Sequence, residues 1–149
     1  MPTSSTLISV CKQCNAWCCT IVKPPVTKQE KDTILQAGFS DHFIQIDENI
    51  YQIQAEDQKP CPYLKKDYSC EIQHIKPKLC KIWPVIPRYK QNKRGYIIIK
   101  CPLYFHLTPQ DIQQAKNEAA AVPQEIVTQL WMISPEMKEK YKRFTYEEL

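Results

Sequence analysis

Glycine is scarce in this sequence, with two residues among 149. The loops that hold phosphate groups in P-loop proteins and in dinucleotide-binding folds need several glycines at fixed spacing, so the sequence excludes both classes of nucleotide-binding protein. It also carries no serine in an arrangement typical of a catalytic nucleophile. Twelve prolines accompany the scarcity of glycine, and they predict a chain divided into short, stiff segments.

The sequence also lacks the features of a secreted or membrane protein. Residues 1–10 contain no lysine or arginine and only a brief apolar run, whereas a signal peptide needs a charged region and a longer apolar stretch. No window is long and apolar enough to cross a bilayer. We therefore predict a cytoplasmic protein without membrane contact, in a compartment that keeps thiols reduced.

Eight cysteines stand out in a chain of this length. They can be interpreted as metal ligands, as disulfide partners or as packing thiols. In a reducing compartment clustered cysteines are more often ligands than cross-links, so we favour metal ligation. The formal charge of +4 counts the thiols as neutral, and metal-bound thiolates would make the loaded protein less positive.

We predict one small domain, residues 1–149, of the α+β class, with short strands and several helices organised around cysteine-ligated metal. Residues 11–102 are its metal-binding region, and residues 108–144 hold its C-terminal helices. Threonine caps and prolines mark the helix starts, and paired apolar runs mark two hairpins. The predicted helices cover 28–37, 109–121, 123–133 and 135–144, with a short one near Pro77, and the predicted strands cover 43–46, 50–54, 86–89 and 96–100.

The first cysteine group has the spacing Cys11-x2-Cys14-x3-Cys18-Cys19. If this segment is helical, residues advance by about 100° each, and Cys11, Cys14 and Cys18 share a face about 60° wide. Three thiols on one face can hold one ion or cluster, and a spacing of two is common among metal ligands. Cys19 would lie about 100° from Cys18, toward a second centre or the core.

The second cysteine group comprises Cys61, Cys70, Cys80 and Cys101, and proline follows the first and the last of these. A Cys-Pro step is familiar after iron–sulfur ligands, where it fixes the outgoing chain. The group has no pair at a spacing of two, so a zinc ribbon does not fit. We predict that all eight cysteines are metal ligands and that the two groups meet in space.

The order of these motifs resembles the YkgJ-type CxxCxxxCC cysteine-cluster family of zinc- or iron-chelating domains. Members continue with a threonine-started helix, a Cys-x-x-Leu step, a Cys-Ile-Tyr-like step and an Arg-Pro-x-x-Cys-Arg-x-Phe-Pro motif. The resemblance covers roughly residues 11–102 and implies a chelating domain. The matching segments here are Thr27, Cys61-Pro62-Tyr63-Leu64, Cys70-Glu71-Ile72 and Lys76-Pro77-Lys78-Leu79-Cys80-Lys81-Ile82-Trp83-Pro84.

Two lysines depart from the family pattern. Lys76 and Lys81 stand where the family has arginines, and lysine cannot make the bidentate contact that arginine makes with a planar anion. A related cysteine motif also occurs in flagellin lysine N-methylases, which are larger proteins. The resemblance alone therefore does not imply methyl transfer.

Residues 72–110 contain no aspartate or glutamate, while lysine and arginine are frequent between 76 and 100. This segment can be interpreted as a surface for an acidic partner, as charge compensation for thiolates or as a solvated face. We expect any protein partner to bind there and do not expect nucleic acid binding. His74 could complete a mixed site, although eight cysteines suffice for two four-ligand centres; His42 and His106 are expected to be structural or exposed.

We interpret the chain as a metal-binding protein that carries an iron–sulfur cluster, with 4Fe–4S preferred, or zinc, and that serves in redox chemistry, electron transfer or metal handling. Two other hypotheses stay open: a cluster-dependent protein-modifying enzyme resembling the methylases, and a zinc-stabilised interaction module with a basic face. The segment 61–101 has several prolines and few apolar runs. We therefore expect it to pack poorly alone and to depend on metal more than the helices after Thr108 do.

Overall fold

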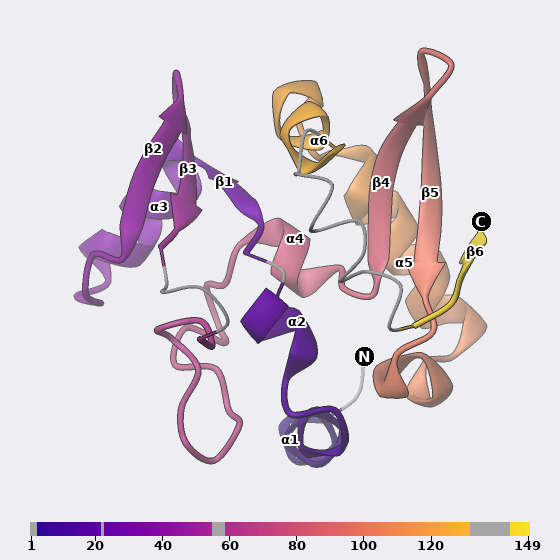
Figure 1. The fold of residues 1–149 in the computed structure, drawn as a ribbon, viewed down its shortest axis with the longest axis horizontal. Helices are drawn as coiled ribbons and strands as arrows, with labels where there is room; N and C mark the ends of the chain where they lie inside the picture. The colour runs from indigo at the N-terminus through magenta and orange to yellow at the C-terminus, as the bar shows by residue number, and fades with distance from the viewer. Residues whose placement is uncertain (1–2, 22, 55–58, 132–143) are drawn as a thin grey trace.

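Two small antiparallel sheets and the helices around them make up the fold (Figure 1). The structure is a computed structural model, and it describes residues 3–21, 23–54, 59–131 and 144–149. The sheets lie at opposite ends of the view in Figure 1, with α2 (Trp17–Ile21) and α4 (Lys78–Lys81) drawn between them. This mixture of short helices and antiparallel strands confirms the predicted α+β class.

The first sheet has the strand order β1-β3-β2, from β1 (Pro25–Thr27), β3 (Ile50–Ile53) and β2 (Phe43–Asp47). α3 (Lys28–Gln36) contacts β1 and β3 and begins at the predicted capping box. Thr27 Oγ1 accepts from the amide of Glu30 at 3.1 Å, and Glu30 Oε1 accepts from the amide of Thr27 at 3.0 Å. Gly38 follows the helix with a φ of +93°, a conformation that favours glycine. The predicted helix and hairpin are thus confirmed.

The second sheet has β5 (Lys93–Ile99) between β4 (Val85–Lys90) and β6 (Tyr146–Glu148). The predicted pairing of residues 86–89 with 96–100 is confirmed, but the connection is shorter than the predicted 91–95. Gln91 and Asn92 adopt φ values of 53° and 62° and close a two-residue turn. Gly95 therefore lies within the ladder, opposite Arg88. The short edge strand β6 was not predicted.

The larger hydrophobic core lies between the second sheet and the helices α5 (Pro109–Ala120) and α6 (Gln124–Trp131), both of which contact β4. Ile97, Ile98 and Ile99 are all buried. Consecutive strand residues point to opposite faces, so both faces of β5 are covered. The expectation of poor packing is therefore wrong for residues 85–99, which form the centre of this core.

The predicted helices that begin at Pro109 and Pro123 are confirmed as far as the structure describes them. Thr108 and Asp111 form the predicted capping box of α5, and α6 follows Pro123. The helix predicted over 135–144 lies outside the described residues, apart from Phe144.

Two short helices, α1 (Ser4–Gln13) and α2, carry the first cysteine group. Asn15 and Ala16 between them have φ values of 53° and 50°, the left-handed conformation that interrupts a helix. The amide of Ala16 donates to the carbonyl of Cys11 at 2.8 Å, and Ala16 is fully buried. The single helical face predicted for three cysteines is therefore wrong, because the helix is broken between them.

A smaller core joins the irregular segment 59–77 to the first sheet. It consists of Ile34 from α3, Ile53 from β3, and Tyr63 and Ile72 from the segment itself. The lack of regular structure in this segment and the short helix α4 after it agree with the sequence. A 3-10 helix, η1 (Pro102–His106), links β5 to α5. Within the described ranges, none of the helices is long and apolar enough to cross a bilayer.

Candidate metal centre

The first cysteine group lies at the junction of α1 and α2. Cys11 belongs to α1, Cys14 caps it, and Cys18 and Cys19 lie in the first turn of α2. The thiol of Cys14 donates to the carbonyl of Cys11 over 3.9 Å. The thiols of Cys18 and Cys19 hydrogen-bond to each other, so these neighbours do not diverge as fully as a helical wheel predicts.

The second cysteine group reaches the first through the backbone. The amide of Cys61 donates to the carbonyl of Cys19 at 2.6 Å. Leu64 and Cys70 form an isolated antiparallel bridge, which holds Cys70 close to Cys61. The remaining two cysteines lie in α4 and immediately before η1, and they are Cys80 and Cys101. The fold thus brings segments far apart in sequence into contact, as expected for two groups that meet.

Backbone N–H groups are directed at several of the cysteine sulfurs. The sulfur of Cys61 accepts hydrogen bonds from the amides two and three residues later, and the sulfur of Cys101 does the same. Cys70 accepts one from the amide of Ile72, and Cys101 a further one from the side chain of Trp83. Such donors stabilise a thiolate, which is the form of cysteine that binds metal.

Burial opposes the thiolate form at the same cysteines. It raises the pKa of the Cys11 and Cys61 thiols to about 11 and the pKa of Cys80 well above its ordinary value. The ammonium group of Lys76 attracts negative charge and lowers the pKa of Cys11 and Cys80 against this trend. At neutral pH these thiols therefore keep their protons until a metal cation replaces them.

The donor set fits a thiolate metal site. All eight cysteines are free, Cys14 and Cys101 are buried, and the other six are half-buried. Among the described residues, which include every cysteine, no three side chains of His, Cys, Asp or Glu are arranged as ligands of one ion. A site that is not formed in the metal-free chain can form when the ion draws its ligands together. Sulfur donors suit zinc or iron–sulfur clusters, not magnesium or calcium.

The histidines take little part in this region. The ring of His42 meets the ring of Tyr63 edge-on at 5.1 Å, and His74 and His106 are exposed. Two tryptophans pack against each other beside the first cysteine group, since the rings of Trp17 and Trp83 lie 6.1 Å apart. Trp17 also meets Phe144 edge-on at 5.3 Å.

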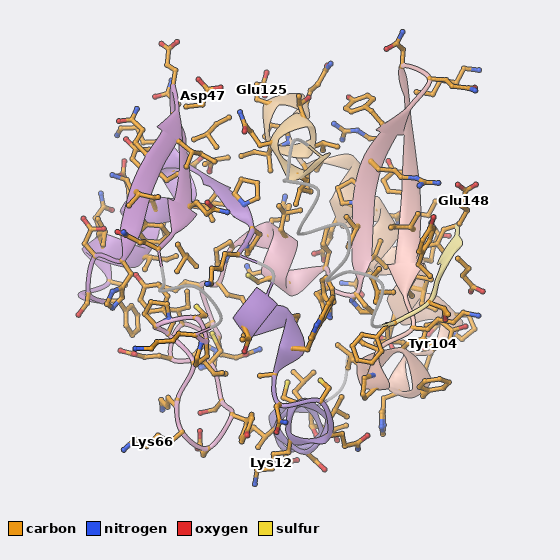
Figure 2. All side chains as sticks on the ribbon, viewed as in Figure 1. Lys12, Asp47, Lys66, Tyr104, Glu125 and Glu148 are labelled. Atoms are coloured by element: carbon orange, nitrogen blue, oxygen red, sulfur yellow. The ribbon has the colours of Figure 1, made fainter. Side chains whose placement is uncertain are left out.

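The basic segment 76–100 does not form one solvated face. Lys76 acts on the cysteine thiols, while Arg88 and Lys100 form ion pairs with the two glutamates of β6. Figure 2 shows one of these glutamates, Glu148, on the short outer strand. Arg94 donates to the carbonyl of Ala120 at the end of α5, 2.8 Å away. These contacts hold the second sheet together, and a protein partner at this segment stays a prediction.

Glu30 is a positioning residue that the sequence did not reveal. Its Oε1 completes the capping box of α3, and its Oε2 accepts from the amide of Lys78 at 2.6 Å. Lys78 begins α4, which carries Cys80, so one carboxylate ties two helices together. The local pattern indicates the capping box, but it contains no sign of which distant amide the second oxygen binds.

Replacing Glu30 with alanine is expected to destabilise the fold by about 3 kcal/mol, from a lost cap and a lost charged hydrogen bond to a backbone amide. Because α4 would lose its anchor, zinc affinity should also fall by on the order of tenfold. The matched control is Asp111→Ala, which removes the same capping box from α5, a helix without cysteine. That control should cost about 1 kcal/mol and leave zinc affinity unchanged. Denaturant unfolding and a zinc competition titration measure both quantities, and equal zinc affinities in the two variants would contradict the role of Glu30.

Comparison with known proteins identifies the domain. Residues 10–117 match the family model described as "CxxCxxCC: Putative zinc- or iron-chelating domain", which confirms the resemblance predicted from the cysteine spacing. The matched residues include all eight cysteines and extend into α5. None of the curated proteins and none of the solved structures compared with the chain matches it. Because the match covers well over half of the sequence, the chain belongs to the CxxCxxCC family of zinc- or iron-chelating domains.

Proposed function

We propose that this protein carries an iron–sulfur cluster of the 4Fe–4S type on its cysteines and uses it to transfer electrons. The supporting observation is a turn that recurs after both Cys-Pro steps, in which two amides donate to the cysteine sulfur. In each turn the second of these amides also donates to the cysteine carbonyl at 2.9 Å. Proline has no N–H, so the next two amides are the first donors available to the sulfur. The same local structure thus prepares Cys61 and Cys101 to carry negative charge.

The surroundings of Cys101 support a redox role. Hydrogen bonds to ligand sulfurs and exclusion of water both influence the reduction potential of an iron–sulfur cluster. Cys101 is 5% exposed and accepts a hydrogen bond from Trp83, whose ring packs beside Trp17. These groups give the protein the means to adjust a potential.

Zinc on the same thiolates is the second candidate, because the family description names zinc as well as iron and because structural zinc sites use four thiolates. Zinc would stabilise the fold or be handled as cargo. Acid-labile sulfide separates the two candidates, since an iron–sulfur cluster contains it and a zinc site does not. The protein-modifying enzyme and the interaction module stay predictions.

Replacing Trp83 with phenylalanine is expected to lower the reduction potential of the cluster. The substitution keeps an aromatic ring but removes an N–H···S hydrogen bond. That hydrogen bond stabilises the reduced cluster, which carries more negative charge, so its loss makes reduction less favourable. Tyr104→Phe is the matched control, because the Tyr104 hydroxyl bonds to Glu147 at 3.3 Å and its amide, which donates to Cys101, is unchanged. Potentials are measured by a redox titration of anaerobically purified protein. Equal potentials in the two variants would contradict the role of Trp83, and colourless protein without sulfide would contradict the cluster itself.

A further inference from the structure

The adjacent cysteines Cys18 and Cys19 stand between two different sets of cysteine neighbours. Their thiols hydrogen-bond to each other. The carbonyl of Cys19 accepts from the amide of Cys61 in the segment 59–77. One set gathers where α1 meets η1, on the larger core. The other gathers on the smaller core, around the segment 59–77 and α4.

Cys101 is the centre of the first set. It is buried in the larger core together with Val10 of α1 and Leu103 of η1, and these two helices are in contact. Cys11 follows Val10 directly, so it lies on the helix that covers Cys101. The thiol of Cys14, at the end of the same helix, donates to the carbonyl of Cys11 over 3.9 Å.

Cys61 is the centre of the second set. It packs with Cys70 against the smaller core, and its amide binds the carbonyl of Cys19 at 2.6 Å. Cys80 completes the set from α4. The carboxylate of Glu30 in α3, whose Ile34 belongs to the smaller core, accepts from the amide of Lys78 at the start of α4 at 2.6 Å. Cys61 thus connects Cys19 to the cysteines of the second sequence group.

We propose, building on the metal binding proposed above, that the eight cysteines form two separate four-thiolate centres joined by the Cys18–Cys19 peptide bond. The first centre consists of Cys11, Cys14, Cys18 and Cys101, and the second consists of Cys19, Cys61, Cys70 and Cys80. The division differs from the two groups in the sequence, because Cys101 joins the N-terminal cysteines and Cys19 joins the central ones. Cys101 is buried in the larger core, while Cys61 and Cys70 pack against the smaller one.

Lys76 is placed to serve both centres. Its charge acts on Cys11 of the first set and on Cys19 and Cys80 of the second. Four thiolates around a divalent ion or a 4Fe–4S cluster leave a net negative charge, which a nearby ammonium group partly offsets. Lys12 and Lys66, on α1 and on the segment 59–77, extend outward instead (Figure 2).

The division is tested on the full, unaltered chain by adding zinc to metal-free protein. The loaded chain should hold about two zinc ions, each bound by about four sulfurs at roughly 2.3 Å in X-ray absorption. With less than a full complement of zinc, alkylation with N-ethylmaleimide followed by peptide mass spectrometry should show the cysteines becoming protected in the two sets named above. A single zinc ion per chain, or protection of Cys11, Cys14, Cys18 and Cys19 as one set, would overturn the division.

Paired variants give a second reading. Cys11→Ser combined with Cys101→Ser removes ligands from one proposed centre and should retain about half of the wild-type zinc. The pair Cys11→Ser and Cys80→Ser damages both centres and should retain almost none. Loss of all zinc from the first pair, with its fold intact by circular dichroism, would overturn the division while metal binding by the wild type stands. A wild-type chain that takes up neither zinc nor iron would overturn the proposed function itself.

Discussion

Removing the bound metal is expected to speed amide exchange in α1, α2 and the segment 59–81 by about a thousandfold or more. Metal removal should leave most of the protection against amide exchange in place in β4, β5, α5 and α6. A structural zinc ion contributes an apparent free energy of roughly 10–16 kcal/mol to the folding of small zinc domains. A thousandfold change in the rate of amide exchange requires a loss of only about 4 kcal/mol in the free energy of local opening. This is the largest effect that the proposed centres predict.

The reason lies in how unevenly the two cores are packed. The smaller core has four buried residues, Ile34, Ile53, Tyr63 and Ile72, and the rest of the segment 59–77 makes turns. The second sheet and its helices share the larger core, in which β5 is covered on both faces. We therefore expect the metal-dependent region to comprise only those parts of residues 11–102 that lie outside β4 and β5.

Two single substitutions test the same expectation without a chelator. Cys14→Ser and Cys80→Ser each remove one ligand and should reduce metal content and loosen the segments that carry the cysteines. Hydrogen exchange, read by mass spectrometry on the wild type and on each variant, measures the change, and α5 serves as the internal reference. Unchanged protection in α1, α2 and residues 59–81 of fully metal-free protein would mean that the cores alone hold the fold.

Replacing Tyr63 with alanine is expected to cost about 3–5 kcal/mol of folding free energy and also to weaken metal binding. The Tyr63 side chain is 1% exposed, its ring contacts His42 and Phe43, and its hydroxyl donates to the carbonyl of Ser40 at 2.5 Å. Cys61 packs against the same core, so a cavity there would free the loop that holds two cysteines. Denaturant unfolding and zinc competition measure the two effects.

Ile98→Ala is the matched control for this variant. Ile98 is fully buried in the larger core, and its truncation should cost about 2–5 kcal/mol. The zinc affinity of the second proposed centre, at temperatures where the variant is folded, should stay near the wild-type value, because the smaller core is untouched. Tyr63→Phe, which removes only the hydroxyl, should cost about 1 kcal/mol. Equal losses of zinc affinity in Tyr63→Ala and Ile98→Ala would show that metal binding follows global stability and not the smaller core.

The parts of the fold that follow from local chemistry were predictable. Thr27 and Thr108 each precede an acidic residue at the third helical position, and Gly38 offers the left-handed conformation that ends a helix. Alternating apolar runs around polar turns gave both hairpins, because strand period and turn residues are read within a few positions.

The errors arose where distant contacts override local preference. Asn15 and Ala16 adopt positive φ without being glycine, and the burial of Ala16 is a tertiary effect that the spacing of the cysteines does not reveal. β6 exists because β5 offers it a partner edge, and its own sequence shows no strand period. The proposed division of the cysteines could not be predicted from the sequence either, since it depends on η1 packing against α1 and on the hydrogen bond between Cys61 and Cys19.

Metal and sulfide analysis of protein purified without air tests the central claim most directly. We predict that native mass spectrometry finds the chain with bound metal, that iron and acid-labile sulfide are present in equal amounts, and that denaturation in chelator releases eight reactive thiols. Zinc without sulfide would agree with a chelating domain but would favour a zinc site, the second candidate, over an iron–sulfur cluster. A folded chain with the mass of the polypeptide alone, in which all eight thiols react with a thiol reagent in the native state, would contradict metal binding altogether.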